Sequence, residues 1–309
     1  MGTLSEAGET LGCAMCSRSY RVANGIPIFV DPTAAAHDEL DHLMGNHVDH
    51  GGHSDGEEHA HKAAQSAFFD RADMAQFEIE RPVGSPAMYR FLLTEKFRRS
   101  LRPLGDRIDG WTALAVCGGS GMDAEFLEAA GASAVISADI SLGAAERARQ
   151  RAIRHGLSMR PIVADVEHLP FADRSVDLVY VHDGLHHLED PATGLREMAR
   201  VARRAVCITE PAEAALTSIG VRLGIALDRE EAGNRVARFE AQPTKAALEA
   251  SGFRVVEARR YAMYYRHVPG RMMKLLSRGP LFPVATHAWR IANGVVGRFG
   301  NKLTVVAVR

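Results

Sequence analysis

The feature that most restricts the fold is a regular alternation of short apolar segments with helical segments in the middle of the chain. Segments with helical periodicity, such as SLGAAERARQRAIRHG and DPATGLREMARVAR, lie between most of the apolar runs. Strands that alternate with helices form a parallel sheet with right-handed crossovers, and helices cover both of its faces. The sequence therefore predicts an α/β fold with a doubly wound sheet. Its strands are expected at 112–117, 134–138, 161–164, 176–182 and 205–209.

The composition fits one large domain with smaller additions. The chain has 309 residues, of which 46% are hydrophobic and 24% charged, so it can bury a full core. A formal net charge of -1 gives no overall attraction to nucleic acid or an anionic membrane, although a local basic patch is compatible with it. The first ten residues lack the basic start and apolar run of a secretory signal. We therefore expect a cytoplasmic protein without a membrane or nucleic-acid partner, and the sequence leaves its oligomeric state open.

The front of the chain predicts a small β unit at 1–30, followed by a linker at 31–62. The segment YRVANGIPIFV reads as two strands joined at Asn24 and Gly25, which both tolerate positive φ. The linker has few apolar anchors and holds half of the histidines, which predicts a flexible segment that could chelate metals. These histidines are His37, His42, His47, His50, His53, His59 and His61.

A helical cap is expected at 63–106, before the core domain at 107–309. Its clearest helix is SPAMYRFLLTEKFRRSL, with Ser85 as N-cap and Pro86 at the first helical position. After residue 210 the alternation gives way to a long helical stretch, then FRVVEARRYAMYY, more helical sequence and a closing strand, KLTVVAVR.

Three glycines at the end of the first core strand indicate a ligand site. Gly118, Gly119 and Gly121 stand where the strand turns into a helix, so a ligand can approach the main chain and the free N–H groups of the helix. Asp139 follows about twenty residues later, at the end of the next strand, where a carboxylate can accept hydrogen bonds from ribose hydroxyls. NAD is one candidate ligand, but the turn meets only the relaxed dinucleotide fingerprint, with Ala124 in place of the last glycine.

The segment IVADVEHLPFADRSVDLVYVHDGLHHLEDP, together with the glycine turn, resembles class I S-adenosylmethionine-dependent methyltransferases. The resemblance spans about residues 107–210 and is closest to the small-molecule type related to ubiquinone-biosynthesis methyltransferases. It implies a Rossmann-like, mostly parallel seven-stranded sheet, S-adenosyl-L-methionine as cofactor and a substrate lid at about 211–250 and 263–300. By this resemblance Gly119 and Gly121 lie against the methionine part of the cofactor, Asp139 holds the ribose, and Asp165 and the Val166 main chain contact the adenine. Gly118 and Ile140 are also expected to bind the cofactor, and His182, at the end of the fourth strand, is expected to face the methyl group.

The chain departs from this family at two positions of the first motif. Ala115 stands where an acid commonly precedes the glycines, and Cys117 replaces the usual first glycine. We expect cofactor binding to be kept, because the two glycines nearest the helix remain. A thiol at an apolar strand end is expected to be an inert small hydrophobe.

Candidate catalytic residues follow the fourth core strand. His182 ends this strand, and its ordinary pKa suits a general base near neutral pH, while His186 follows on the next loop. Glu210 ends the fifth strand, where it could orient a polar group of the substrate or cap a helix. An aromatic and cationic wall suited to a planar or anionic acceptor is expected from Tyr264, Tyr265, Arg266 and His267.

The segment LGCAMCSRSYRVANGIPIFVDP resembles the second half of a four-cysteine zinc ribbon that precedes some methyltransferase domains, including a ribosomal-RNA guanine methyltransferase. Only twelve residues precede Cys13, so the first C-x-x-C pair of such a ribbon is absent. Cys13 and Cys16 cannot complete a tetrahedral zinc site by themselves. Either the ribbon has degenerated and its hairpin survives through packing, or histidines complete the site.

The leading hypothesis is a methyltransferase that acts on an oxygen, nitrogen or sulfur atom of a small molecule. An RNA methyltransferase is the alternative that the ribbon-like front suggests and the overall charge does not support. A subunit that binds cofactor or metal without catalysis is the alternative from another class.

Overall fold

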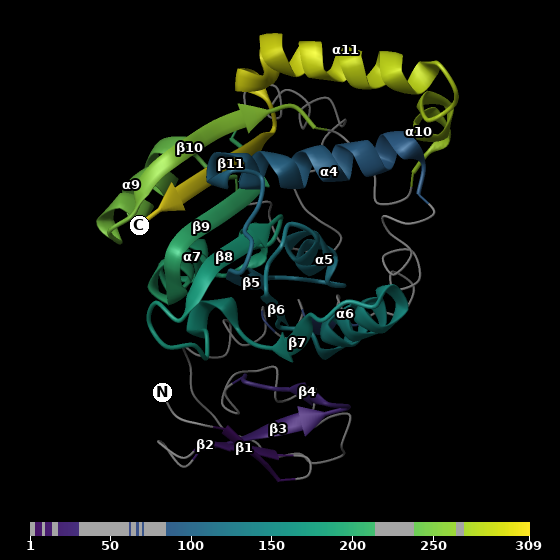
Figure 1. The fold of residues 1–309 in the computed structure, drawn as a ribbon. Coiled ribbons are helices and arrows are strands. Elements are labelled where there is room, and N and C mark those ends of the chain that lie inside the picture. Colours follow the sequence, from purple (N-terminus) through teal and green to yellow (C-terminus); the bar gives the residue numbers. More distant parts are fainter. Residues whose placement is uncertain are drawn as a thin grey trace.

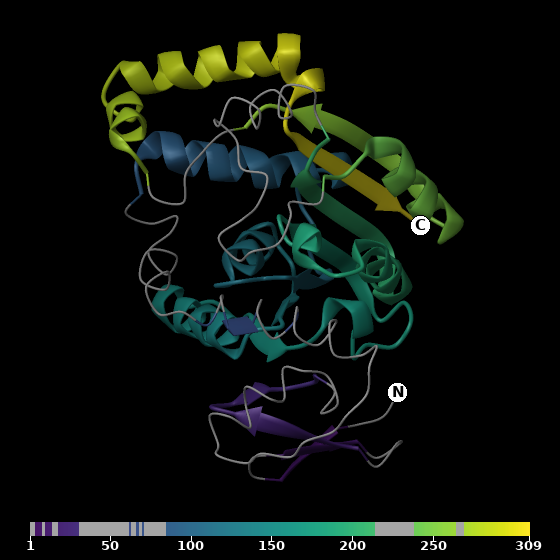
Figure 2. The same ribbon diagram turned by 180° about the vertical axis from the view of Figure 1, so that it is seen from behind.

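The computed structural model of the chain contains a seven-stranded sheet and a separate four-stranded antiparallel sheet (Figures 1 and 2). The strand order of the large sheet is β10-β11-β9-β8-β5-β6-β7. Its strands are β5 (Thr112–Val116), β6 (Ala134–Asp139), β7 (Arg160–Val163), β8 (Val176–His182), β9 (Ala202–Pro211), β10 (Arg254–Tyr261) and β11 (Lys302–Val308). The structure describes residues 4–7, 10–13, 18–30, 62, 66–67, 70, 85–213, 238–263 and 269–309.

The expected doubly wound, mostly parallel sheet is confirmed. The strands β7, β6, β5, β8 and β9 are parallel, and β11 runs antiparallel between β9 and β10. Every strand expected from the alternation is present to within a few residues. The chain moves outward from β5 in one direction to β6 and β7, and in the other direction to β8 and β9. The strand order therefore reverses between β5 and β8, which is where ligands bind in folds of this kind.

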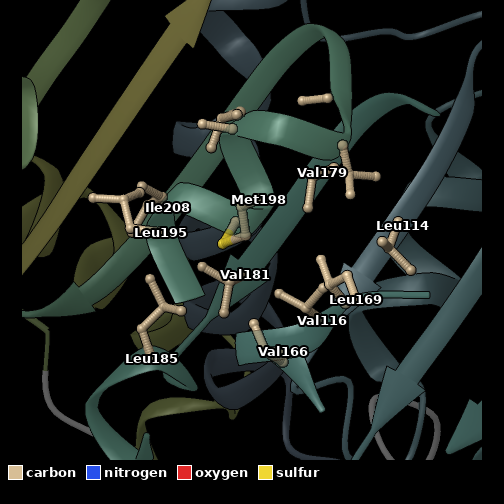
Figure 3. Packing of buried hydrophobic residues seen from close by; sticks show 14 of the residues in the cluster. Leu114, Val116, Val166, Leu169, Val179, Val181, Leu185, Leu195, Met198 and Ile208 are labelled. Carbon is tan, nitrogen blue, oxygen red and sulfur yellow. The ribbon is translucent and has the colours of Figure 1, made fainter. Parts of the chain in front are cut away.

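Helices cover both faces of the sheet, and each face has its own apolar core. On one face, α7 (Pro191–Val201) and α9 (Ala241–Ala250) pack against the strands through side chains that include Leu195, Met198 and Leu248. Figure 3 shows Met198 beside Val179 and Val181, which are fully buried on β8. On the other face the cover consists of α4 (Ala87–Leu101), α5 (Met122–Ala129) and α6 (Leu142–His155). β8 is buried along its whole length, as its continuous apolar run requires.

Local capping explains where these helices begin. The side chain of Ser141 accepts a hydrogen bond from the Ala144 N–H at the start of α6, and Asp190 caps α7 with Pro191 at its first position. The expectation for α4 was wrong. Ser85 is not its N-cap, because the helix begins at Ala87, and Pro86 stands at the cap position without a side-chain hydrogen bond.

The helices that follow β9 lie in two different places relative to the large sheet. α9 lies beside α7 and flanks the sheet, so this part of the expected lid belongs to the main layers (Figure 1). α10 (Arg271–Leu276) and α11 (Leu281–Val296) lie beyond α4, on the side of that helix away from the sheet (Figures 1 and 2). Phe91 of α4 packs edge to face against Trp289 of α11, with ring centroids 5.4 Å apart. No described helix is long and apolar enough to cross a membrane.

The N-terminal unit is docked against the edge of the large sheet. It consists of β1 (Leu4–Ala7), β2 (Thr10–Cys13), β3 (Ser19–Ala23) and β4 (Ile26–Pro27), with Asn24 and Gly25 at positive φ in the expected hairpin turn. Ile28 forms a parallel bridge with Val163 at the end of β7, where the Phe29 N–H donates to the Val163 carbonyl at 2.8 Å. Ile26 is fully buried in a cluster with Ile28 and Val163. The expected linker and most of the histidine-rich segment lie outside the described residues.

The buried side chain of Ile26 predicts how strongly this docking stabilises the chain. Ile26→Ala should lower the free energy of unfolding of the N-terminal unit by about 2–5 kcal/mol, because it leaves a cavity in a closed cluster. Hydrogen exchange of the β3 and β4 amides measures this loss. Arg21→Ala, which removes an exposed side chain from the same strand pair, is the matched control. Equal exchange in both variants would show that the unit does not depend on this contact.

Candidate functional site

The glycine turn lies at the carboxyl end of β5, beside the point where the strand order reverses. Gly119 and Gly121 both have positive φ, 51° and 80°, and Gly121 is the N-cap residue of α5. A Cβ atom on Gly121 would lie 2.9 Å from the Met159 sulfur, so this glycine allows α5 to pack closely. A Cβ atom on Gly119 would meet no described atom within 4 Å. Gly119 therefore presents open backbone toward a space that a ligand could fill.

Cys117 has a backbone conformation that favours glycine. Its φ is 49°, in the left-handed region, and a Cβ atom on Gly184 would lie 2.3 Å from the Cys117 Cβ. This geometry agrees with the family's use of glycine at that position. Burial, together with the nearby carboxylates of Asp139 and Glu210, raises the pKa of the Cys117 thiol well above its ordinary value. The thiol is thus protonated at neutral pH, which agrees with the expectation of an inert residue.

Asp139 connects the end of β6 to the glycine turn. Its Oδ2 accepts a hydrogen bond from the Gly119 N–H at 2.8 Å, and its Oδ1 accepts one from the Ser141 N–H at 3.0 Å. The side chain is buried, and burial raises the pKa of the carboxyl while the two N–H donors oppose that shift. Each carboxylate oxygen keeps a second lone-pair direction. The carboxylate is therefore held rigidly with acceptor capacity left for ribose hydroxyls, and Ile140 follows it directly.

Asp165 follows the carboxyl end of β7, at the same edge of the sheet as the glycine turn and Asp139. Its Oδ1 accepts from the Glu167 N–H at 2.9 Å and opens the short 3-10 helix η3 (Val166–His168). Its Oδ2 accepts from the Lys62 ammonium at 2.9 Å. Asp165 therefore caps the turn that follows β7. The adenine contacts expected at Asp165 and at the Val166 main chain stay predictions.

His182 ends β8 in a closed environment. Its Nε2 lies 3.4 Å from an oxygen of Asp183 and its Nδ1 lies 3.9 Å from one of Asp123, with 1% of the side chain exposed. Neither ring nitrogen has a hydrogen-bond partner among the described residues. Burial, assisted by the positive charge of Lys96, lowers the pKa of His182 to about 3. The expectation of a base with an ordinary pKa does not hold, because the neutral imidazole is a weak base here.

Two lysines beside His182 were not foreseen from the sequence. Lys96 of α4 and Lys302 of β11 both form ion pairs with Asp183. Their charges outweigh burial and hold the pKa of the Asp183 carboxyl well below its ordinary value. Lys96 sits within an apolar helical stripe, and Lys302 is about 120 positions away in sequence from Asp183, so no local pattern could have connected them.

His186 and Glu210 form a buried pair. The His186 Nδ1 lies 2.7 Å from Glu210 Oε2, and the side chains are 3% and 0% exposed. Glu210 Oε1 also accepts from the N–H groups of Gly184 and Leu185, at 2.9 and 2.8 Å. The carboxylate therefore holds the loop after β8 and orients the imidazole. The Glu210 side chain has no exposed surface, and its expected contact with substrate stays a prediction.

Two residues that precede α4 also reach the site. The Lys62 ammonium pairs with Glu167 at 2.6 Å in addition to Asp165, and these hydrogen bonds raise its pKa although burial opposes them. Asp70 Oδ1 accepts hydrogen bonds from the Ser141 hydroxyl and the Gly143 N–H, at 2.5 and 2.7 Å. Both residues lie beside the acids expected to bind adenosine. The sequence predicts Lys62 at the end of a linker and gives no sign of either contact.

Several expected site residues cannot be placed. Tyr264, Tyr265, Arg266 and His267 lie outside the described residues, as does Cys16. Cys13 ends β2, and the described part of the chain contains no group of three or more side chains suited to a metal ion. Zinc binding at Cys13 and Cys16 stays a prediction.

Comparison with known proteins bears on the same region. Residues 114–207 match the family model described as a methyltransferase domain. This match begins in β5 and ends in β9, so it includes the glycine turn, Asp139, His182 and His186. The resemblance inferred from the motifs is thus confirmed for the core of the large sheet.

A curated relative matches about a third of this chain, whereas two solved structures superimpose on most of it. A demethylmenaquinone methyltransferase of Corynebacterium urealyticum is 37% identical over 107 residues, which are 35% of this chain and 44% of the relative. Magnesium protoporphyrin IX methyltransferase from Synechocystis PCC 6803, solved with bound SAH, superimposes with a TM-score of 0.56 at 16% identity, over 80% of this chain and 99% of that one. A chain of the complex between the Haloferax volcanii Trm112 methyltransferase activator and a methyltransferase gives 0.52 at 20% identity, over 78% and 96%. The two structures establish a shared fold, and the chain spans less than half of the curated relative.

The arrangement fits an adenosine-type cofactor in three respects. Gly119 opens onto free space, Asp139 offers a fixed carboxylate, and His182 has buried ring nitrogens without a partner among the described residues. Buried polar atoms normally find partners, so such nitrogens point to a polar ligand near the end of β8. These features meet where the strand order reverses.

The lowered pKa of His182 predicts a loss of stability in acid. The unfolded imidazole takes up a proton near pH 6.5, whereas the folded one does so only near pH 3, so stability present above pH 6.5 is lost as the pH falls through this window. The loss should reach about 2 kcal/mol at pH 5. Urea unfolding between pH 7 and 4 measures it, with His182→Gln as the comparison, because that variant lacks the titrating group. Parallel stability curves for the two proteins would contradict a buried, neutral His182.

Proposed function

We propose that the chain is an S-adenosyl-L-methionine-dependent methyltransferase that acts on an oxygen, nitrogen or sulfur atom of a small molecule. The observation that carries this proposal is the cradle of open Gly119 backbone and fixed Asp139 carboxylate, within the segment that matches a methyltransferase domain. The cytoplasmic location inferred from the sequence belongs to the same proposal.

The cofactor supplies an activated methyl group on a sulfonium when bound, so the chain has to bind and align more than it has to activate. Asp139 would hold the ribose, and Gly119 would admit the methionine part close to the main chain. His182 would line the site near the reacting atoms as a neutral hydrogen-bonding group. Lys96 and Lys302 keep the adjacent Asp183 ionised, which fixes the negative charge beside His182.

His186 is the better placed of the two candidate bases. Its Nδ1 donates to Glu210, which leaves Nε2 as the proton-accepting nitrogen. A carboxylate that orients an imidazole also stabilises the imidazolium formed after proton transfer. This assignment applies to acceptors that must lose a proton during methyl transfer.

The name of the Corynebacterium urealyticum relative suggests the first compound class for a substrate screen. Demethylmenaquinone should be tested beside small phenols, amines and thiols, with labelled S-adenosylmethionine as methyl donor. Transfer to a phenol, amine or thiol supports the proposal. Transfer to demethylmenaquinone would support a methyltransferase but would place the acceptor atom on carbon instead of oxygen, nitrogen or sulfur. Tight cofactor binding without transfer to any acceptor in a metabolite extract would favour the alternative of a subunit that binds cofactor without catalysis.

Cofactor binding should depend on Asp139. Asp139→Ala is expected to weaken binding of S-adenosylhomocysteine by about 1–3 kcal/mol, because ribose hydroxyls lose a charged acceptor. Isothermal titration calorimetry measures the change. Asp109→Ala, which removes an exposed carboxylate paired with Arg107, is the matched control and should leave affinity unchanged. Equal affinity in all three proteins would move the ribose site elsewhere.

Turnover should depend on the His186–Glu210 pair. His186→Ala is expected to lower turnover roughly a hundredfold while cofactor affinity stays within about twofold. Glu210→Gln should move the acidic limb of the pH–rate profile to lower pH, since the imidazolium loses its carboxylate partner. His187→Ala removes the neighbouring imidazole, leaves the Glu210 contact and serves as control. An unchanged profile in Glu210→Gln would leave the pair with a structural role only.

A further inference from the structure

Exposed apolar side chains gather in one part of the molecule. Nine large hydrophobic side chains are strongly exposed among the described residues, and eight of them lie between residues 272 and 299. This segment forms α10, α11 and the short η5 (Gly297–Phe299). The eight are Met272, Leu275, Leu281, Val284, Ile291, Val295, Val296 and Phe299. Single exposed hydrophobic residues are ordinary, but a set this concentrated marks an interaction surface.

The two faces of α11 explain why these side chains remain exposed. Phe282, Ala285 and Trp289 form the inner face and pack with Phe91 of α4. Val284, Ile291 and Val295, spaced by seven and four residues, fall together on the outer face and are 66%, 55% and 70% exposed. Figures 1 and 2 show α11 at the outer boundary of the molecule, beyond α4. The helix is thus apolar on the side that turns away from the protein.

Charge in the same region has one sign. Between residues 269 and 300 the chain contains five Lys and Arg residues and no Asp or Glu, although the whole chain has a formal net charge of -1. One of the five, Arg290, pairs with Glu95 of α4 at 3.3 Å. Arg271, Lys274 and Arg278 are exposed around α10, and Arg298 is exposed on η5. The expectation of no membrane partner rested on the net charge of the whole chain, which conceals this local excess.

We propose that the outer face of α10, α11 and η5 is a docking surface for an anionic lipid bilayer. A helix with an apolar outer face and basic residues beside it lies in the plane of a membrane, with its apolar side chains at the boundary between headgroups and acyl chains. The cations contact the negative headgroups at the same time. This surface is independent of the proposed catalytic function.

The charges and side-chain types disfavour two other occupants. A second copy of the chain on the same face would place two wholly cationic segments against each other, which costs free energy. Nucleic acid would use the cations, but single-stranded bases stack on aromatic side chains, and seven of the eight exposed hydrophobic residues are aliphatic. A lipid surface accommodates both the aliphatic side chains and the positive charge.

Vesicle sedimentation with the full-length protein tests the proposal. The protein should bind vesicles of phosphatidylcholine that contain about one third phosphatidylglycerol, bind pure phosphatidylcholine at least tenfold more weakly, and dissociate as salt is raised. Val284→Asp combined with Val295→Asp should lower partitioning at least about tenfold. Lys274→Glu combined with Arg278→Glu should lower it at least about twentyfold. All four side chains are exposed, so the variants should keep the melting temperature of the parent.

Matched controls come from α6, on another side of the molecule. Ile153 is 70% exposed, like Val295, and Arg154 is exposed beside it, so Ile153→Asp and Arg154→Glu should leave partitioning unchanged. Equal binding to both vesicle types, or equal loss in the α6 and α11 variants, would overturn the proposal. Sedimentation equilibrium tests binding of a second copy of the chain, and titration with single-stranded RNA tests binding of nucleic acid. Self-association or RNA binding that the α11 variants abolish, without vesicle binding by the parent, would also overturn it.

Discussion

The hydrogen bond between the Asp139 carboxylate and the Gly119 N–H is the interaction on which the site depends. It joins the ends of β6 and β5 across 20 residues of sequence and fixes the turn that opens toward the reversal of strand order. The same carboxylate accepts from Ser141, whose side chain caps α6. Because the group is buried, losing one partner would cost more than an exposed hydrogen bond is worth. The turn, the acid and the start of α6 are therefore positioned as one unit.

Around this unit, apolar and polar side chains lie in different parts of the structure. The two faces of the sheet carry apolar cores with ordinary packing, while polar groups concentrate at the carboxyl ends of the strands. There the buried pair of His186 and Glu210 and the ion pairs of Asp183 hold the loop after β8 in place. The outer helices add a third layer over α4, and their exposed apolar side chains concentrate on the side away from the sheet. The proposed cofactor site and the proposed docking surface thus lie in different layers.

Much of this could be predicted from sequence because it rests on local patterns. The strands, the Asn24–Gly25 hairpin, the caps at Ser141 and Asp190 and the glycine turn are each encoded within a few residues. The lowered pKa of His182 could not be predicted, because it arises from burial and from Lys96 on α4, far away in sequence. The contacts of Lys62 with Asp165 and of Lys302 with Asp183 join residues more than a hundred positions apart. The basic excess near the end of the chain was visible in sequence but was averaged away in the net charge.

A crystal structure of the protein with bound S-adenosylhomocysteine tests the central claim most directly, since it reports where the ribose and the homocysteine lie. The account predicts both ribose hydroxyls within hydrogen-bond distance of Asp139, the homocysteine against the Gly119 main chain, and a ligand atom near the ring of His182. A ligand bound away from the carboxyl ends of β5 and β8, or with its ribose distant from Asp139, would contradict it.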